Sequence, residues 1–139
     1  MVRMPRNRWI DGILLSAFLL SIVHYVDNTL RFDDYSPDPG LITRPLIPIS
    51  WVVFTAFGVW GYLQYRKGED AKAAVGLAVY SASGLIGPLH FTAVSPSDFD
   101  WFQNLFVVLD TLAGIAVLGV ACSLALRSQK GNAPATSDA

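Results

Sequence analysis

Four long stretches of apolar residues, separated by short polar and charged clusters, follow one another along this chain. A straight helix needs about 20 residues to cross a hydrocarbon layer of roughly 30 Å. Residues 9–28, 48–65, 71–91 and 101–126 each have about that length. None of them alternates strictly between apolar and polar residues, as a barrel strand would. The pattern therefore predicts an all-α protein, a four-helix bundle that spans a membrane.

The composition agrees with a protein that is surrounded by lipid. Hydrophobic residues make up 53% of the chain and charged residues only 15%. The net charge of −1 gives no general attraction to nucleic acid, so we expect the lipid bilayer, and not a nucleic acid, as a partner. Aromatic side chains, which favour the membrane interface, lie near the predicted helix ends. They are Trp9, Tyr25, Trp51, Tyr62, Tyr65, Phe91, Phe99, Trp101 and Phe102.

Basic residues are distributed unevenly between the two sides of the predicted bundle. Loops on the cytoplasmic side of a membrane carry an excess of lysine and arginine. The asymmetry predicts cytoplasmic termini, with loops 29–47 and 92–100 outside, in a multi-pass protein of the inner (plasma) membrane. The outer side has only Arg31 and Arg44, whereas the inner side has Arg3, Arg6, Arg8, Arg66, Lys67, Lys72, Arg127 and Lys130.

The two ends of the chain have different expected roles. Three arginines before residues 13–23 imitate a signal peptide, but the sequence that follows, His24-Tyr25-Val26-Asp27-Asn28, is no small-residue cleavage site. We therefore expect an uncleaved signal-anchor helix and a membrane domain over residues 1–127. Residues 128–139 are small and polar, which predicts a disordered cytoplasmic tail.

The first outer loop is rich in Pro and Asp and is expected to form a partly ordered cap.

Each predicted span has a face of small or polar residues that would pack against other helices. Helices in lipid associate through close packing and hydrogen bonds between them. Pro88 should kink the third span and leave the Gly84 carbonyl in need of a partner. The predicted faces are Ala17/Ser21/His24/Asn28, Trp51/Thr55/Gly58/Tyr62/Tyr65, Ala74/Ala78/Ala82 with Ser83/Gly87/His90, and Gln103/Asp110/Gly114/Val117/Ala121.

A group of polar residues should lie at the outer end of the bundle. His24 lies about one turn inside the end of the first span, below Asp27 and Asn28, and His90 lies at the same level on the third span. Asp110 lies nine residues past Trp101, or about 13 Å along a helix. A charged group in a span is destabilising by roughly 2.5 to 3.5 kcal/mol, so each should face the bundle and have a partner.

Three interpretations of this group remain open. In the first it is structural: the polar residues near the helix ends bond across the bundle, and Asp110 pairs with a serine, threonine, tyrosine or histidine. In the second it forms a pocket for a small molecule or lipid under the first loop, lined by Tyr25, Trp51 and Phe91. In the third it forms a metal, haem or proton-relay site, with His24 and His90 as metal ligands. No single helix carries a His-x-x-His or Glu-x-x-His pair.

The sequence identifies no reaction and no cofactor. It lacks Gly-x-Ser-x-Gly, glycine-rich phosphate loops and zinc-binding cysteine clusters. The one cysteine, Cys122, is expected near the inner end, far from both histidines, which excludes a Cys–His nucleophile. Whether the protein is an enzyme is left open.

Three strings resemble a group of small bacterial four-span membrane proteins that have no assigned activity. They are His24-Tyr25-Val26-Asp27-Asn28, the run from Arg31 to Pro37, and Gly87-Pro88-Leu89-His90-Phe91. The resemblance implies a bacterial inner-membrane location. We predict a non-enzymatic protein that binds a small hydrophobic ligand or lipid, or is the accessory subunit of a partner membrane protein. Its expected outer pocket uses His24, Asp27, Asn28, Trp51, His90 and Asp110; the alternative is a metal- or haem-linked redox or transport component that uses His24 and His90.

Overall fold

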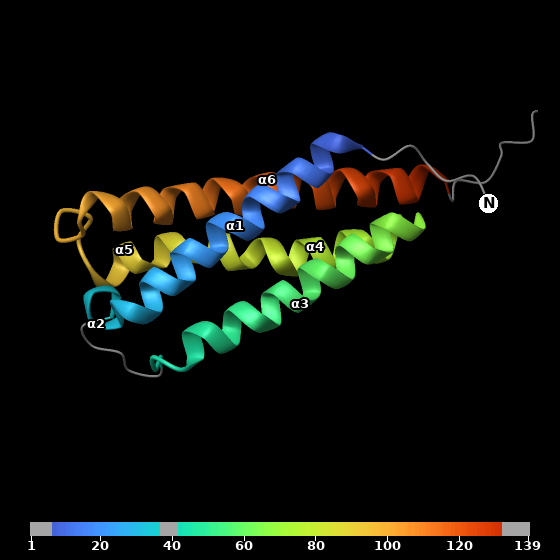
Figure 1. The fold of residues 1–139 in the computed structure, drawn as a ribbon. Helices are drawn as coiled ribbons and strands as arrows, with labels where there is room; N and C mark the ends of the chain where they lie inside the picture. Colours follow the sequence, from blue (N-terminus) through green and yellow to red (C-terminus); the bar gives the residue numbers. More distant parts are fainter. Residues whose placement is uncertain (1–6, 37–41, 132–139) are drawn as a thin grey trace, which may run out of the picture.

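The computed structural model describes residues 7–36 and 42–131, which form helices and no strands (Figure 1). The long helices are α1 (Arg8–Leu30), α3 (Leu46–Lys67), α4 (Asp70–Leu85) and α6 (Trp101–Gly131). The short helices α2 (Phe32–Tyr35) and α5 (His90–Ala93) cover one end. Four helical segments, Arg8–Leu30, Leu46–Lys67, Asp70–Ala93 and Trp101–Lys130, are long and apolar enough to cross a membrane. The predicted all-α, four-helix architecture is confirmed.

Local sequence determines where the helices begin and end. The Asn7 side chain accepts a hydrogen bond from the Trp9 N–H and caps the start of α1. α3 ends at Gly68, whose φ of 80° is the left-handed conformation that glycine adopts most readily. α6 continues to Gly131, so residues 128–131, expected in the tail, are helical. Residues 132–139, the rest of the predicted tail, lie outside the described residues.

The third span is interrupted where Pro88 predicts a kink. α4 ends at Leu85, a 3₁₀ turn follows over Gly87–Leu89, and α5 continues toward the loop. The Thr111 hydroxyl donates to the Val107 carbonyl oxygen at 2.7 Å and lies 3.4 Å from the Gly84 carbonyl oxygen. A side chain of α6 therefore lies within hydrogen-bonding distance of the carbonyl that Pro88 leaves without its helical partner.

α4 lies between α6 and α3 and contacts both over most of its length (Figure 1). Glycines permit this closeness: a Cβ on Gly76 would come within 2.7 Å of the Gly61 Cα in α3. A Cβ on Gly84 would come within 2.3 Å of the Asp110 carbonyl oxygen in α6. Backbone-to-backbone contact therefore holds three of the four long helices together. The helix α1 packs mainly on α6, and the apolar core includes Ala73, Leu77, Val117 and Leu124.

The predicted packing faces are confirmed for the first and fourth spans, where every residue named is buried. For the third span the alanine face is wrong in part, because Ala78 is exposed. The larger side chains of Leu77 and Tyr80 occupy the contact surface instead. On α3, only Gly58 of the predicted face is fully buried, since this helix has neighbours on one side only.

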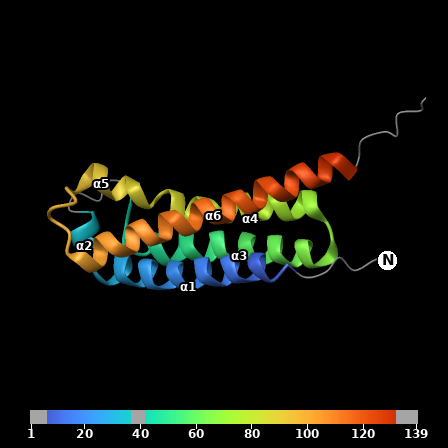
Figure 2. The ribbon, with the colours of Figure 1, turned by 90° about the horizontal axis from the view of Figure 1, so that it is seen from above.

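Two ends of the bundle are distinct (Figures 1 and 2). α2, α5 and the last turns of α1 gather at one end, which we call the loop end. The described residues nearest to both chain termini lie at the other, which we call the terminal end. His24 and His90 both lie toward the loop end, as the four-span topology requires.

Candidate functional site

Side chains from α1, α2 and the broken third span meet at the loop end. The Asn28 amide nitrogen and the His90 Nε2 are 3.0 Å apart and share a hydrogen bond. The His24 ring lies 5.7 Å from the His90 ring, centroid to centroid, and Tyr35 contacts both histidines at 6.1 and 4.8 Å. His24 is 2% exposed and Tyr35 is fully buried. We call His24, Asn28, Tyr35 and His90 the histidine cluster.

An ionic network covers the histidine cluster. The Tyr35 hydroxyl donates to Asp27 Oδ2 at 2.7 Å, and the Arg31 guanidinium contacts Asp27 Oδ1 through Nε at 2.8 Å and Nη2 at 2.7 Å. Arg31 also pairs with Asp100, which precedes α6. Burial and the bond to Asp27 raise the pKa of the Tyr35 phenol, and the pairing with Asp100 raises the pKa of Arg31. The network ties α1, α2 and α6 together at the loop end.

Asp100 also caps α6. Its carboxylate accepts from the Gln103 N–H at 2.8 Å, and the Gln103 side chain accepts from the Asp100 N–H at 3.0 Å. This reciprocal pair is a capping box. The hydrogen bond from Gln103 and the pairing with Arg31 lower the pKa of Asp100. The stabilisation from this carboxylate is therefore present at neutral pH and is lost as the pH falls through the lowered pKa.

The structure brings four of the six predicted site residues together: His24, Asn28 and His90 in the cluster, with Asp27 directly above them. Trp51 lies deeper, where its indole N–H donates to Ser21 Oγ at 3.1 Å. Asp110 lines a separate small cavity between α1, α4 and α6. The expected pairing of Asp110 with a serine, threonine, tyrosine or histidine is not formed among the described residues.

The histidine cluster can bind polar atoms, but its set of metal ligands is incomplete. Within the described residues, His24 Nδ1 and Asn28 Oδ1 are buried without a hydrogen-bond partner. Across residues 7–36 and 42–131, no three side chains of His, Cys, Asp or Glu are grouped as a metal site would need. A protein-bound zinc ion, for example, takes three or four protein ligands, whereas His24 and His90 supply two.

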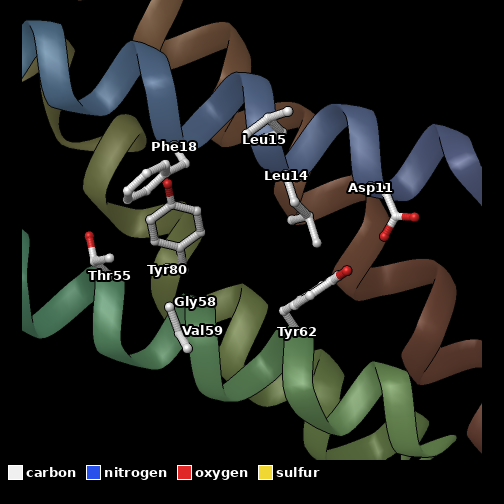
Figure 3. A pocket seen from close by; sticks show the side chains of 9 residues that line it. All are labelled: Asp11, Leu14, Leu15, Phe18, Thr55, Gly58, Val59, Tyr62 and Tyr80. Atoms are coloured by element: carbon white, nitrogen blue, oxygen red, sulfur yellow. The ribbon is translucent and has the colours of Figure 1, made fainter.

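Two cavities lie between α1 and α3. The one nearer the loop end has a volume of about 360 Å³ and is lined by apolar surface from both helices, including Tyr25, Val26 and Trp51. The other, of about 340 Å³, lies nearer the terminal end (Figure 3). Its Phe18 and Tyr80 lie close together, while Asp11 lies toward the terminal end (Figure 3). Two of the residues predicted to line a pocket, Tyr25 and Trp51, thus line one.

Sequence reasoning did not include Tyr35 and Arg31 among the site residues. Tyr35 is three positions after Phe32, and both rings are buried against the bundle by the single turn of α2. An apolar i, i+3 pair within an otherwise polar loop was the available signal. Arg31 is four residues after Asp27 on α1, a spacing that favours an ion pair.

Comparisons of the chain with family models, with curated proteins and with solved structures find no match. The resemblance to small bacterial four-span proteins therefore stays a prediction.

Proposed function

We propose that this protein is a non-enzymatic membrane protein that binds one phospholipid by an acyl chain, in the cavity between α1 and α3 near the loop end. The observation that carries the proposal is the 360 Å³ cavity, which is within the range of ligand pockets and has an apolar lining. Val26 and Leu30, which line it, are more than half exposed, so the cavity is open sideways to the bilayer.

The rigidity of the loop end favours the binding of one lipid in the cavity over loose contact with bilayer lipids. Trp51 is held by Ser21, and the end of α1 is held by the histidine cluster and by Arg31. A preformed cavity binds with a smaller loss of conformational entropy than one that must be ordered. In this proposal the histidine cluster supports the cavity wall and does not contact the lipid.

Native mass spectrometry of the detergent-purified protein tests the proposal. We expect a population that carries one phospholipid mass. Val26→Trp should reduce that population several-fold, because the larger ring fills the cavity. Val23→Trp is the matched control, since Val23 is an exposed valine on the same helix that does not line the cavity. Absence of a retained lipid, or equal retention by both variants, would contradict the proposal.

We also propose that the loop end faces the outside of the cell and that both termini are cytoplasmic. Along the sequence, eight lysines and arginines lie before the first span, in or next to the second loop or after the last span, and two lie in the first loop, which is the positive-inside distribution. In a Cys122→Ser background, a cysteine in place of Ser97 should react with a membrane-impermeant maleimide in intact cells. A cysteine in place of Lys67 should react only after permeabilisation, and the reverse pattern would invert the topology.

A further inference from the structure

Asp110 lies where two helices approach most closely. A Cβ on Gly84 would meet the Asp110 carbonyl oxygen at 2.3 Å, and a Cβ on Gly114 would meet the Ser81 carbonyl oxygen at 2.9 Å. These two glycines face each other, and they bring the α4 and α6 backbones into contact next to Asp110. Asp110 is 2% exposed, so its carboxyl is isolated from both lipid and bulk water.

The surroundings of Asp110 contain no compensating positive charge. Among the described residues, no lysine, arginine or histidine pairs with it, and its Oδ2 has no hydrogen-bond partner. The phenols of Tyr25 on α1 and Tyr80 on α4 interact with it electrostatically, and both are uncharged at neutral pH. The end of α4 at Leu85 is also close, and the C-terminal end of a helix disfavours an anion.

A small cavity adjoins the carboxyl. Its volume is about 10 Å³, close to the roughly 10–15 Å³ that one water molecule requires. Polar residues on its wall include Tyr80, Ser81 and Ser83 as well as Asp110. The Tyr80 hydroxyl is buried and interacts with the Ser21 side chain on α1. A water here would have the two or more polar partners that buried waters typically have.

We propose that Asp110 is a proton-binding site inside the membrane: a neutral carboxylic acid that shares this cavity with one water molecule. An ionised carboxylate without a partner is strongly unfavourable in an apolar interior, and such a group is neutralised by taking up a proton. The water supplies the hydrogen bond that no described side chain supplies. Neither the proposed lipid site nor the histidine cluster includes Asp110, so this inference is independent of the proposed function.

Tyr80 gives the site a route for proton exchange. It lines both the Asp110 cavity and the 340 Å³ cavity between α1 and α3. Figure 3 shows its side chain reaching from α4 toward Phe18, at the boundary of the larger cavity. Its hydroxyl can both donate and accept a hydrogen bond. Protons therefore reach Asp110 from the larger cavity by way of Tyr80 and the buried water.

Infrared spectroscopy of the protein in lipid tests the proposal. We expect a protonated-carboxyl C=O band at neutral pH that shifts in D₂O and is absent from Asp110→Asn. A wild-type spectrum without this band, or a band that is unchanged in Asp110→Asn, would overturn it. A band that disappears when Na⁺ replaces K⁺ would assign the cavity to a sodium ion and would also overturn it.

A second variant keeps the test informative if Asp110→Asn does not fold. Tyr80→Phe retains the ring and removes the hydroxyl. It should move the carboxyl band and slow its exchange in D₂O at least several-fold, whereas Tyr25→Phe, whose hydroxyl is directed to the Ser83 carbonyl, should leave the exchange rate unchanged. Equal exchange rates in both variants would contradict the route through Tyr80.

Discussion

Gly84→Ala is expected to destabilise the bundle more than any other single added methyl group. The new Cβ would lie 2.3 Å from the Asp110 carbonyl oxygen and 3.1 Å from its carbon, both backbone atoms of α6. Backbone cannot move aside as a flexible side chain can, so α4 and α6 must separate. Overpacking of this kind lowers the free energy of unfolding by about 1–3 kcal/mol, and occasionally by more. Unfolding in a denaturing detergent, followed by circular dichroism, measures the change.

Gly119→Ala is the matched control, because no atom lies within 4 Å of the Cβ position at Gly119 on α6. Alanine has a higher helix propensity than glycine by about 1 kcal/mol, so this variant should be as stable as the wild type or more so. The two substitutions are chemically identical, but only Gly84→Ala should lower the free energy of unfolding. A Gly84→Ala protein as stable as Gly119→Ala would show that α4 and α6 do not touch there.

The four spans could be predicted because their signal is local. Hydrophobic length and the positions of Pro88 and the interfacial aromatic residues are properties of neighbouring residues, and the structure has helix ends or a break near them. Which glycines touch another helix is not local. Gly58, Gly84 and Gly119 are all helical glycines, but only the first two meet a neighbouring helix. Whether a helical glycine meets another helix depends on how the helices are arranged around the bundle, and the sequence does not show that arrangement.

Only part of the candidate site could be predicted from the sequence, because only part of it depends on local signals. The first and third spans run in the same direction, so the sequence alone places His24 and His90 at the same end of the bundle. The structure brings their rings together. The position of Asp110 relative to them depends on helix crossing, and Asp110 lies in its own cavity. Tyr35 was not predicted because α2 is a single turn, too short for a periodic signal.

The polar residues thus form two separate levels with different physical roles. At the loop end, hydrogen bonds and ion pairs join Asn28 to His90 and Asp27 to Tyr35 and Arg31, and they fix the positions of α1, α2 and α6. Deeper in the bundle, Asp110 has no such partners among the described residues. Satisfied buried networks confer rigidity, whereas an unsatisfied buried acid has to take up a proton or a ligand. In our proposals the loop-end network therefore has a structural role, whereas Asp110 takes up a proton.

Asp27→Ala should give the largest loss of stability at the loop end. The substitution removes the acceptor of the Tyr35 hydroxyl, which is fully buried, and one of the two carboxylates that bind Arg31. A buried donor left without a partner and a lost charged hydrogen bond together lower the free energy of unfolding by about 2–3 kcal/mol. The same detergent unfolding measurement applies, and Asp33→Ala is the control. Asp33 pairs with Arg44 on the surface, where an ion pair contributes less than about 1 kcal/mol.

A double-mutant cycle separates the hydrogen bond from other effects of Asp27→Ala. Tyr35→Phe removes the hydroxyl, so in its presence Asp27→Ala leaves no unpaired donor on the buried ring. The loss caused by Asp27→Ala should then be smaller by about 1 kcal/mol or more, which is the coupling expected of residues in direct contact. Strict additivity, or equal losses for Asp27→Ala and Asp33→Ala, would mean that this carboxylate does not hold α2 against the bundle. In that case Tyr35 would be held against His24 and His90 by ring contacts alone.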